Sequence, residues 1–317
     1  MKIQKFLIAL IVYLFAIFYI SGCSRKSESL YFVLVPKSIS NPYWFQAEDG
    51  MKAAGKKLGV KVELNGPVQA ADVTAQVNIM ESLIARHVSG IAISPNDPDG
   101  VTEVIDRAMK EGIPVLTFDS DAPKSKRICY IGTDNYQAGR EAGKQMIKFL
   151  GEKGEYAIMT GGLGALNLNE RIRGFRDELK AAKVRVKEVN ILACNDDPDK
   201  ALLQIEDMTR SMPTLDAWFV TGCWATVSPQ GAFLNALNHR KDMVIIGFDT
   251  VKEELLLVKA GLVQALIGQR PYDMGEKCVE TLYDIVVNKK KPQKEIIDTG
   301  VDVITQENVE QFLSKHK

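Results

Sequence analysis

Histidines and closely paired cysteines are scarce in this sequence. Its 317 residues include three histidines (His87, His239 and His316) and five cysteines. No two histidines have a metal-ligand spacing, and no two cysteines form a Cys-x-x-Cys pair. Because zinc sites are built from such closely spaced ligands, we expect no metal site.

The sequence also lacks the common signatures of enzymes and of nucleic-acid binding. Lysine plus arginine and aspartate plus glutamate are balanced at 40 each, so no basic excess indicates nucleic acid. There is no Gly-x-Ser-x-Gly elbow and no Gly-x4-Gly-Lys-Ser/Thr loop. The segment GGLGALN (161–167) has two glycines of a dinucleotide fingerprint, but Asn167 replaces the third. NDDPD (195–199) lacks the alternating oxygens of a calcium loop and predicts a turn followed by a helix start. We therefore expect a protein that is not an enzyme and has no cofactor.

The first residues predict export. Two lysines precede an unbroken apolar run of 15 residues over 6–20, which is shorter than the ~20 residues of a membrane span. The run leads through Ser-Gly into Cys23, a sequence that resembles the lipobox of bacterial lipoproteins. We expect a signal peptide over 1–22, a lipidated Cys23 that anchors an extracytoplasmic protein to a bacterial membrane, and a polar tether over 23–29. The alternative is an uncleaved signal anchor in which Cys23 is incidental.

Beyond residue 30, short apolar runs alternate with segments of helical spacing. Such alternation predicts parallel sheets covered on both faces by helices. Eleven strands are too many for one compact open sheet, so we expect an α/β fold with two doubly wound, parallel-sheet lobes. The predicted strands cover 31–36, 61–65, 90–95, 114–118, 128–132, 156–161, 186–192, 217–222, 244–248, 263–268 and 301–305.

The cysteines after Cys23 are far apart in the sequence. Cys278 falls on the apolar stripe of a predicted helix with Met274 and Leu282, where a buried thiol is expected. Cys194 and Cys223 both lie near predicted strand ends. The sequence leaves open whether these two form a disulfide outside the cytosol.

The two halves of the chain share a pattern that places an aspartate after a strand. VLTFDSD (115–121) and VIIGFDT (244–250) each end an apolar strand in Phe-Asp followed by a hydroxyl residue. Ligands bind beyond the carboxyl ends of strands in open α/β sheets, so we expect Asp119 and Asp249 to face one shared cleft. The alternative is that each carboxylate caps a following helix.

Three adjacent aromatic residues, Tyr43, Trp44 and Phe45, begin a predicted helix after the first strand. Flat rings can bury the apolar C–H faces of a pyranose. Carboxylates, and amides such as Asn41, can bind its hydroxyl groups through hydrogen bonds. The combination indicates a sugar site. We expect Phe45 to turn into the core, and a core position is also the alternative for Trp44.

Several segments resemble the periplasmic sugar-binding proteins of the ribose/galactose-binding type, which deliver monosaccharides to ATP-driven importers. The resemblance covers roughly residues 30–305. It implies a monomeric, two-lobed protein, a monosaccharide ligand and an ABC permease as partner. The segments, in the family's order, are NPYWFQAEDGMKAAGKKLGV (41–60), IARHVSGIAISPNDPDGVTEVIDRAMKEGIPVLTFDSD (84–121), IGTDNYQAGREAG (131–143), ERIRGF (170–175), VIIGFDT (244–250) and IGQRPYDMG (267–275).

The resemblance also implies a set of ligand contacts. Ribose binders have arginine at the positions of Ser120 and Asn169 and an aromatic residue at that of Asp196, so ribose itself is in doubt. Trp224 is the candidate for the missing ring. Arg171 is expected either to supply a positive donor or to brace the cleft. The positions that correspond to the family's ligand contacts are Asn41, Tyr43, Trp44, Asp119, Ser120, Asn169, Asp196, Asp249 and Gln269.

The family's fold implies lobe one over 30–133 plus 270–299 and lobe two over 134–269 plus 300–317. Three hinge segments would join the lobes. A sugar that touches both lobes would stabilise their closed arrangement.

Other functions remain open. The closed form could dock on a chemoreceptor or histidine kinase and serve as a sensor. The missing arginines also leave room for a furanosyl signalling molecule. The same fold serves the effector domains of lactose-repressor-type regulators, but the apolar run occupies the place of their helix-turn-helix. An exported enzyme is the remaining alternative, but the sequence shows no nucleophile–base or metal constellation that would support it.

Overall fold

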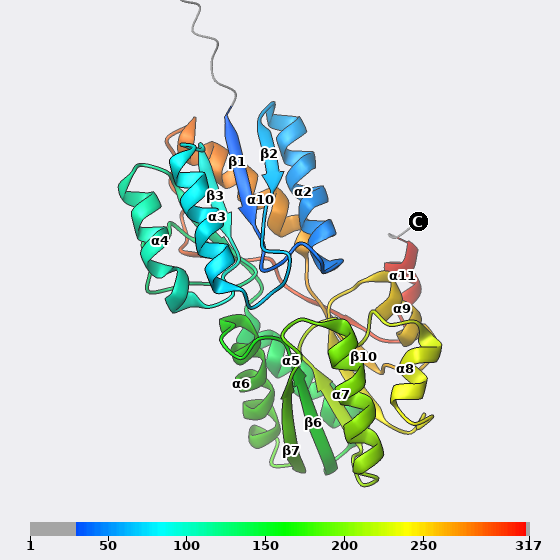
Figure 1. Ribbon diagram of the computed structural model, residues 1–317. Helices are drawn as coiled ribbons and strands as arrows, with labels where there is room; N and C mark the ends of the chain where they lie inside the picture. The colour runs from blue at the N-terminus through cyan, green and yellow to red at the C-terminus, as the bar shows by residue number, and fades with distance from the viewer. Residues whose placement is uncertain (1–29, 315–317) are drawn as a thin grey trace, which may run out of the picture. The chain divides into compact units, whose positions relative to one another are not determined.

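The computed structural model describes residues 30–314, in which the strands form two six-stranded sheets (Figure 1). Sheet A has the order β11-β5-β4-β3-β1-β2, and sheet B has the order β12-β10-β9-β8-β6-β7. Every pairing is parallel except that of β10 with β12. The prediction of two parallel α/β sheets is thereby confirmed.

Sheet A contains β1 (Tyr31–Val35), β2 (Lys61–Leu64), β3 (Gly90–Ile93), β4 (Val115–Phe118), β5 (Tyr130–Gly132) and β11 (Ile296–Asp298). Sheet B contains β6 (Lys153–Thr160), β7 (Arg185–Ala193), β8 (Ala217–Val220), β9 (Val244–Phe248), β10 (Ala265–Gly268) and β12 (Asp302–Ile304).

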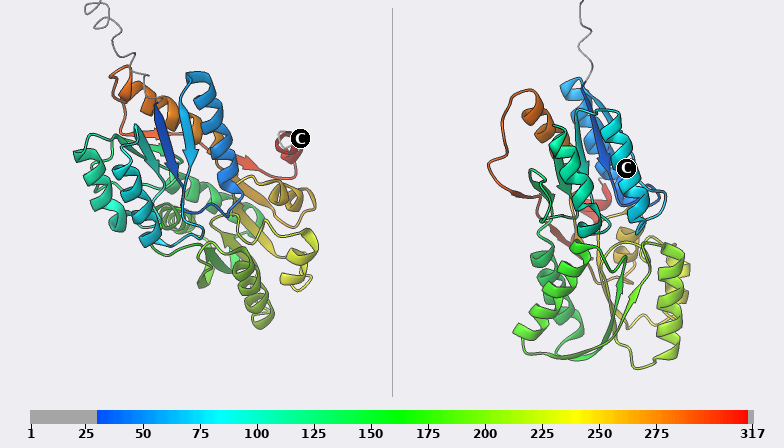
Figure 2. Two further views of the ribbon diagram at one scale, coloured as in Figure 1. Left: turned by 45° about the horizontal axis from the view of Figure 1, so that its top comes forward. Right: turned by 60° about the vertical axis from the view of Figure 1, so that its left-hand side comes forward.

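Helices cover both faces of sheet A (Figures 1 and 2). α2 (Tyr43–Leu58) packs against α10 (Pro271–Val286) on one face, and α3 (Val73–Ala85) lies beside α4 (Pro98–Lys110) on the other. Glycine permits the first of these contacts, because a Cβ at Gly275 would lie 1.9 Å from the carbonyl oxygen of Ala47. β3 and β4 are buried along their whole length, and Thr117 is their only polar residue, as expected for a sheet that is covered on both faces.

Sheet B is covered in the same way. α5 (Asn135–Leu150) and α6 (Leu166–Ala181) pack closely on one face, where a Cβ at Gly139 would lie 2.1 Å from the carbonyl oxygen of Arg171. The other face carries α7 (Pro198–Ser211), α8 (Gln230–Ala236) and α9 (Lys252–Lys259), and α9 also contacts α11 (Val309–Leu313). On both faces, clusters of buried apolar side chains pack between sheet B and its helices.

The sequence prediction missed β11, the edge strand beside β5. Ile296 is 56% exposed there, and the strand has no fully buried residue. An edge strand of three residues gives no apolar run, so hydrophobic patterning alone cannot detect it.

The chain passes between the sheets three times. It crosses from sheet A to sheet B between β5 and β6, returns between β10 and β11, and crosses again between β11 and β12. Within residues 30–314, no helix is long and apolar enough to cross a membrane. Cys23 and the predicted signal peptide lie outside the described residues.

The four cysteines of the described part of the chain are free thiols, so Cys194 and Cys223 are not joined in the structure. Cys278 is fully buried in α10, as the apolar stripe predicted. Asp197 caps α7 by accepting a hydrogen bond of 3.0 Å from the backbone N–H of Lys200, with Pro198 as the first helical residue. The interpretation of NDDPD as a turn and helix start is therefore confirmed.

Candidate functional site

The carboxyl ends of the strands in both sheets carry a cluster of polar side chains that is mostly buried. In a parallel sheet these ends lie at one edge, where open α/β sheets bind ligands. Hydrogen bonds join the residues from sheet A to those from sheet B. The cluster contains Lys37, Ser38, Asp119 and Ser120 after strands of sheet A, Asp196, Trp224, Asp249 and Gln269 after strands of sheet B, and Asn167 and Arg171 from α6.

Asp119 is the most highly connected carboxylate of the cluster. It follows β4 and is 3% exposed. One carboxylate oxygen accepts a 3.0 Å hydrogen bond from the hydroxyl of Tyr43, and the other accepts one of 2.7 Å from Ser94. Burial, and then the negative charge of Asp119, raises the pKa of Tyr43 well above its ordinary value, so the phenol stays protonated and donates. No helix begins at Asp119, which excludes the helix-cap alternative at this position.

Lys37 connects the two sheets. It is buried after β1, and its ammonium group donates a 2.6 Å hydrogen bond to Oδ1 of Asn167 in α6. The amide of Asn167 in turn donates to Asp119 at 3.3 Å, and Lys37 Nζ lies 3.8 Å from the same carboxylate. Burial lowers the pKa of Lys37, while the nearby carboxylates of Asp119 and Asp196 act in the opposite direction.

Asp249 is the second carboxylate at a strand end. It accepts a 2.7 Å hydrogen bond from Nε2 of Gln269, whose Oε1 accepts one of 2.9 Å from the hydroxyl of Thr133. Thr133 follows the last strand before the first crossing between the sheets, so this chain of hydrogen bonds also runs from one sheet to the other. The N-cap of α9 is Val251, so Asp249 does not cap that helix. Burial raises the pKa of Asp249, and the positive charge of Arg171 partly offsets that effect.

Arg171 is buried and held in place by its neighbours. Its Nε donates to Oδ1 of Asn135 at 2.9 Å, and one terminal nitrogen donates to the carbonyl of Thr221 at 2.7 Å. The guanidinium lies 4.3 Å from the ring centroid of Phe248. The other terminal nitrogen has no hydrogen-bond partner among the described residues. Arg171 is therefore braced on three sides and keeps one donor free.

Asp196 and Trp224 both pack against Gly161, the residue after β6. A Cβ there would lie 1.9 Å from Oδ1 of Asp196 and 2.7 Å from the Trp224 ring. Burial is the main cause that raises the pKa of Asp196 to about 6, and the positive charge of Lys37 acts against it. Glycine is thus required at position 161 for the carboxylate and the ring to lie side by side.

The backbone at all three aspartates is unusual. Asp119, Asp196 and Asp249 have φ angles of 58°, 61° and 81°, in the left-handed region that non-glycine residues seldom adopt. Aspartate tolerates this conformation better than most residues. Such conformations gather at functional sites, where the surrounding structure maintains them.

Five buried polar atoms of the cluster have no hydrogen-bond partner among residues 30–314. They are the hydroxyl oxygens of Ser38 and Ser120, one terminal nitrogen of Arg171, Oδ1 of Asp196 and Nε1 of Trp224. Native proteins leave few buried polar atoms unpaired, so five in one region require an explanation. Two are donors only, one is an acceptor when ionised, and two hydroxyls can act as both.

Two amide and two aromatic residues that the sequence analysis singled out lie in four different environments. Asn169 does not join the cluster, because its side chain is exposed and donates to the carbonyl of Leu163 at 2.9 Å. Asn41 accepts a 3.4 Å hydrogen bond from the thiol of Cys223, across the two sheets. Trp44 is buried with its ring edge-on to Tyr43 and Phe118, which ties it to the core of sheet A. The expectation that Phe45 turns inward is wrong, because the side chain is 53% exposed.

Sequence reasoning missed Lys37 and Asn167. Asn167 and Arg171 are four residues apart and so share one face of α6, whereas Asn169 points to another side of the helix. The helical period would have favoured Asn167 once the start of α6 was known. Lys37 directly follows the strand 31–36, the same type of position that identified the two aspartates. Among residues 30–314 no group of three or more potential metal ligands lies together.

Comparison with known proteins identifies the family. Residues 32–290 match the family described as the periplasmic binding protein domain. A solute-binding protein of an ABC transporter from Burkholderia graminis C4D1M, in complex with D-arabinose, is 37% identical, with 90% of this chain and 98% of that chain covered and a TM-score of 0.83. The ribose import binding protein RbsB of Bacillus subtilis (strain 168) is 29% identical, with 80% of each chain covered. A protein in a XylFII–LytSN complex is 33% identical over 88% of this chain and 98% of that chain, with a TM-score of 0.77. Since the matched region covers most of the sequence, this chain belongs to the periplasmic binding protein family.

Proposed function

We propose that this protein binds a monosaccharide outside the cytoplasm and delivers it to an ABC importer. The observation that carries the proposal is the set of five unpaired buried polar atoms among the strand ends of both sheets. Each hydroxyl of a sugar is both a donor and an acceptor, so a sugar can satisfy a mixed set of this kind. The three neighbouring carboxylates disfavour an anionic ligand such as a phosphate.

The two lobes would act as a clamp. We place lobe one at 30–133 plus 270–299 and lobe two at 134–269 plus 300–317, with the three crossings between the sheets as the hinge. A sugar that bonds to Asp119 from one lobe and to Asp249 from the other stabilises the closed arrangement, because it loses one set of contacts when the lobes open. The mechanism involves no chemical change of the ligand.

The proposed ligand contacts are those of the family pattern apart from Asn169, whose exposed side chain lies outside the cluster, together with four additions. Trp224 offers a ring face and an indole N–H, and Arg171 offers a free guanidinium nitrogen. Lys37 and Asn167 join the set because both lie at the carboxylate of Asp119, which also accepts the hydrogen bond from Tyr43. Relatives named for D-arabinose and ribose make pentoses the first sugars to test.

A thermal-shift screen of the purified protein against pentoses, hexoses and deoxyhexoses tests the proposal. A sugar at ~100 times its dissociation constant adds about 2.7 kcal/mol of stability, which raises the melting temperature of a protein of this size by about 5 °C. A protein that melts at the same temperature with every one of these sugars would contradict monosaccharide binding.

The proposed anchor is a lipid on Cys23. Replacement of Cys23 by serine is expected to move the protein from the membrane fraction to the soluble fraction or to leave an unprocessed precursor. Fractionation of wild-type and Cys23→Ser cells decides between lipidation and the uncleaved signal anchor. Identical fractionation of the two proteins would exclude the lipid.

A sensor is the second candidate function, favoured by the relative that was solved in a complex with another protein, XylFII with LytSN. Uptake of the labelled sugar into cells separates the two functions. If this protein is a component of the importer, deletion of its gene abolishes uptake at low sugar concentration. If it is a sensor, deletion of its gene leaves uptake intact in cells that express the transporter from a promoter independent of the sensor.

A further inference from the structure

The end of sheet A at which β1 begins carries a strongly basic surface. Because all strands of sheet A are parallel, their starts lie at one edge together with Tyr31. We call this edge the amino-end face and define it by the segments that lead into the strands. These segments contain twelve lysines and arginines and two glutamates. They are 56–61, 86–89, 110–114, 124–129 and 287–295.

Basic side chains of this face lie directly at Tyr31. Lys61 is the register partner of Tyr31 in β2, and its ammonium group lies 4.0 Å from the centroid of the Tyr31 ring. Arg86 donates a 3.0 Å hydrogen bond to the Tyr31 hydroxyl. Two basic side chains therefore flank the point at which the chain leaves the fold toward Cys23, together with the carboxylate of Glu63, which accepts a hydrogen bond from the Tyr31 hydroxyl.

Only part of this positive charge is neutralised within the protein. Lys57 pairs with Glu280, Lys124 pairs with Asp99, and Arg127 pairs with Asp121 and Glu295. The remaining lysines of the face have no ion pair among residues 30–314. They are Lys56, Lys61, Lys110, Lys126, Lys289, Lys290, Lys291 and Lys294.

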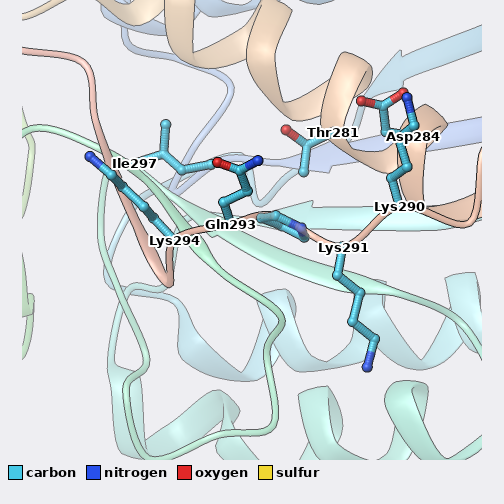
Figure 3. A pocket seen from close by; sticks show the side chains of 8 residues that line it. Thr281, Asp284, Lys290, Lys291, Gln293, Lys294 and Ile297 are labelled. Carbon is cyan, nitrogen blue, oxygen red and sulfur yellow. The ribbon is translucent and has the colours of Figure 1, made fainter.

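A preference of lysine for helix ends explains only some of these residues. Lys289 donates a 2.7 Å hydrogen bond to the carbonyl of Val286, the last residue of α10, and thus caps the helix. Lys290, Lys291 and Lys294 lie beyond the last turn, where the helix dipole no longer favours positive charge. These three lysines border a pocket of about 260 Å³ that is also lined by Thr281, Asp284 and Gln293 (Figure 3).

The three lysines do not converge on one point. Figure 3 shows Lys290 beside Asp284, whereas Lys291 and Lys294 extend away from it in different directions. Such an arrangement is unsuited to enclosing a single phosphate. It suits a partner that presents many separate negative groups on one surface.

We propose that the amino-end face lies against a membrane surface of anionic phospholipids. The inference rests on the proposed lipid anchor, because eight peptide units between Cys23 and Tyr31 span at most about 28 Å when fully extended. A lipid on Cys23 therefore keeps Tyr31 and this face within about 28 Å of the headgroups. Basic residues near such a surface are attracted over a Debye length, which is about 8 Å at physiological salt. Anchor and basic face together give two signals for stable membrane attachment.

Lysine acetylation of the mature protein on vesicles tests this orientation. The protein is reconstituted on phosphatidylcholine vesicles with or without about 30% phosphatidylglycerol, and the acetylation rate of each lysine is measured by mass spectrometry. With phosphatidylglycerol, acetylation of Lys290, Lys291 and Lys294 is expected to slow by about threefold or more. In about 0.5 M NaCl the protection disappears because salt screens the attraction. Equal rates on both kinds of vesicle would overturn the proposal.

A pair of matched variants gives the control. The triple variant Lys290→Gln/Lys291→Gln/Lys294→Gln is expected to lose the protection of Lys61 and Lys126. The variant Lys153→Gln/Lys180→Gln/Lys241→Gln removes the same charge from exposed positions around sheet B and is expected to retain it. Loss of protection in both variants would mean that only net charge matters and would overturn the assignment of the face.

The test also separates this inference from the proposed function. Binding to neutral vesicles reports the lipid anchor, and a sugar-induced rise in melting temperature reports the ligand site. Protection of the amino-end face can be present or absent whatever the outcome of the sugar screen.

Discussion

Lys37, which follows β1 of sheet A, and Asn167, in α6 on sheet B, form a 2.6 Å hydrogen bond although they are 130 residues apart. Asn167 also donates to Asp119, so a buried cation, an amide and a carboxylate form one connected group. A hydrogen bond between charged and neutral groups in a buried site is stronger than one at the surface. This contact therefore helps to hold the strand ends of sheet A against α6.

Replacement of Lys37 by methionine is expected to weaken sugar binding at least about tenfold, which corresponds to about 1.4 kcal/mol. The variant leaves Asp119 and Asp196 without their nearby buried cation and breaks the link to Asn167. Calorimetric titration with the sugar identified by the thermal screen measures the effect. Lys52→Met is the control, because its exposed ammonium pairs with Glu48 at the surface and such pairs contribute at most about 1 kcal/mol to stability. Unchanged affinity of Lys37→Met would show that the contact is only structural.

Replacement of Asp119 or Asp249 by alanine is expected to cost more than about 2 kcal/mol of binding free energy, because hydrogen bonds to charged acceptors contribute about 1.5–3 kcal/mol. Asp72 is the matched control, since it is a true N-cap that accepts a 2.8 Å hydrogen bond from the N–H of Ala75. Asp72→Ala should lose about 1 kcal/mol of stability and keep its affinity. Titration and denaturation of the three variants separate the roles. Normal sugar binding by both cluster variants would remove the two aspartates from the ligand site.

The raised pKa of Asp196 predicts a pH dependence of stability. Its folded pKa is about 6, against an ordinary value of 3.8, so the folded state holds the proton more tightly than the unfolded chain. The contribution of protonated Asp196 to the free energy of unfolding is therefore fully present below about pH 4. As the pH rises to about 6 this contribution, up to about 3 kcal/mol, is lost.

Asp196→Asn is expected to remove this dependence. The variant should be more stable than the wild type near pH 7 and similar to it near pH 4, as measured by urea denaturation. Asp249 and Glu254 have pKa values raised by burial as well, so some decline with pH remains. An unchanged pH profile in Asp196→Asn would contradict the assignment.

A methyl group at Gly161 is expected to disturb the ligand site. In Gly161→Ala the new Cβ would overlap Oδ1 of Asp196 and the Trp224 ring, so both must move and sugar affinity should fall at least about tenfold. Gly231→Ala in α8 is the control, because nothing lies within 4 Å of the position that the alanine Cβ would take, and alanine favours a helix by about 0.5–1 kcal/mol. Equal sugar affinity in both variants would exclude a role for the packing at Gly161.

Part of the fold could be predicted from local patterns. Alternation of apolar runs with helical segments predicted two parallel sheets, because a strand that is buried on both faces has a nearly continuous run of apolar residues. Phe-Asp at the ends of two strands predicted the edge where Asp119 and Asp249 lie. β11 left no such pattern, because a short strand at a sheet edge needs few buried residues.

The sequence by itself determined the order of strands and helices along the chain, the apolar cores and the polar strand ends, since each depends on neighbouring residues and on periods of two and 3.6. Only the tertiary structure decided that Lys37 is buried, that Asn167 rather than Asn169 joins the cluster, and that Phe45 is exposed. These outcomes depend on which element from the other part of the chain covers each side chain. A lysine can remain buried where Asp119 and Asn167 meet it, and contacts between residues 80 or more apart leave no trace in local periodicity.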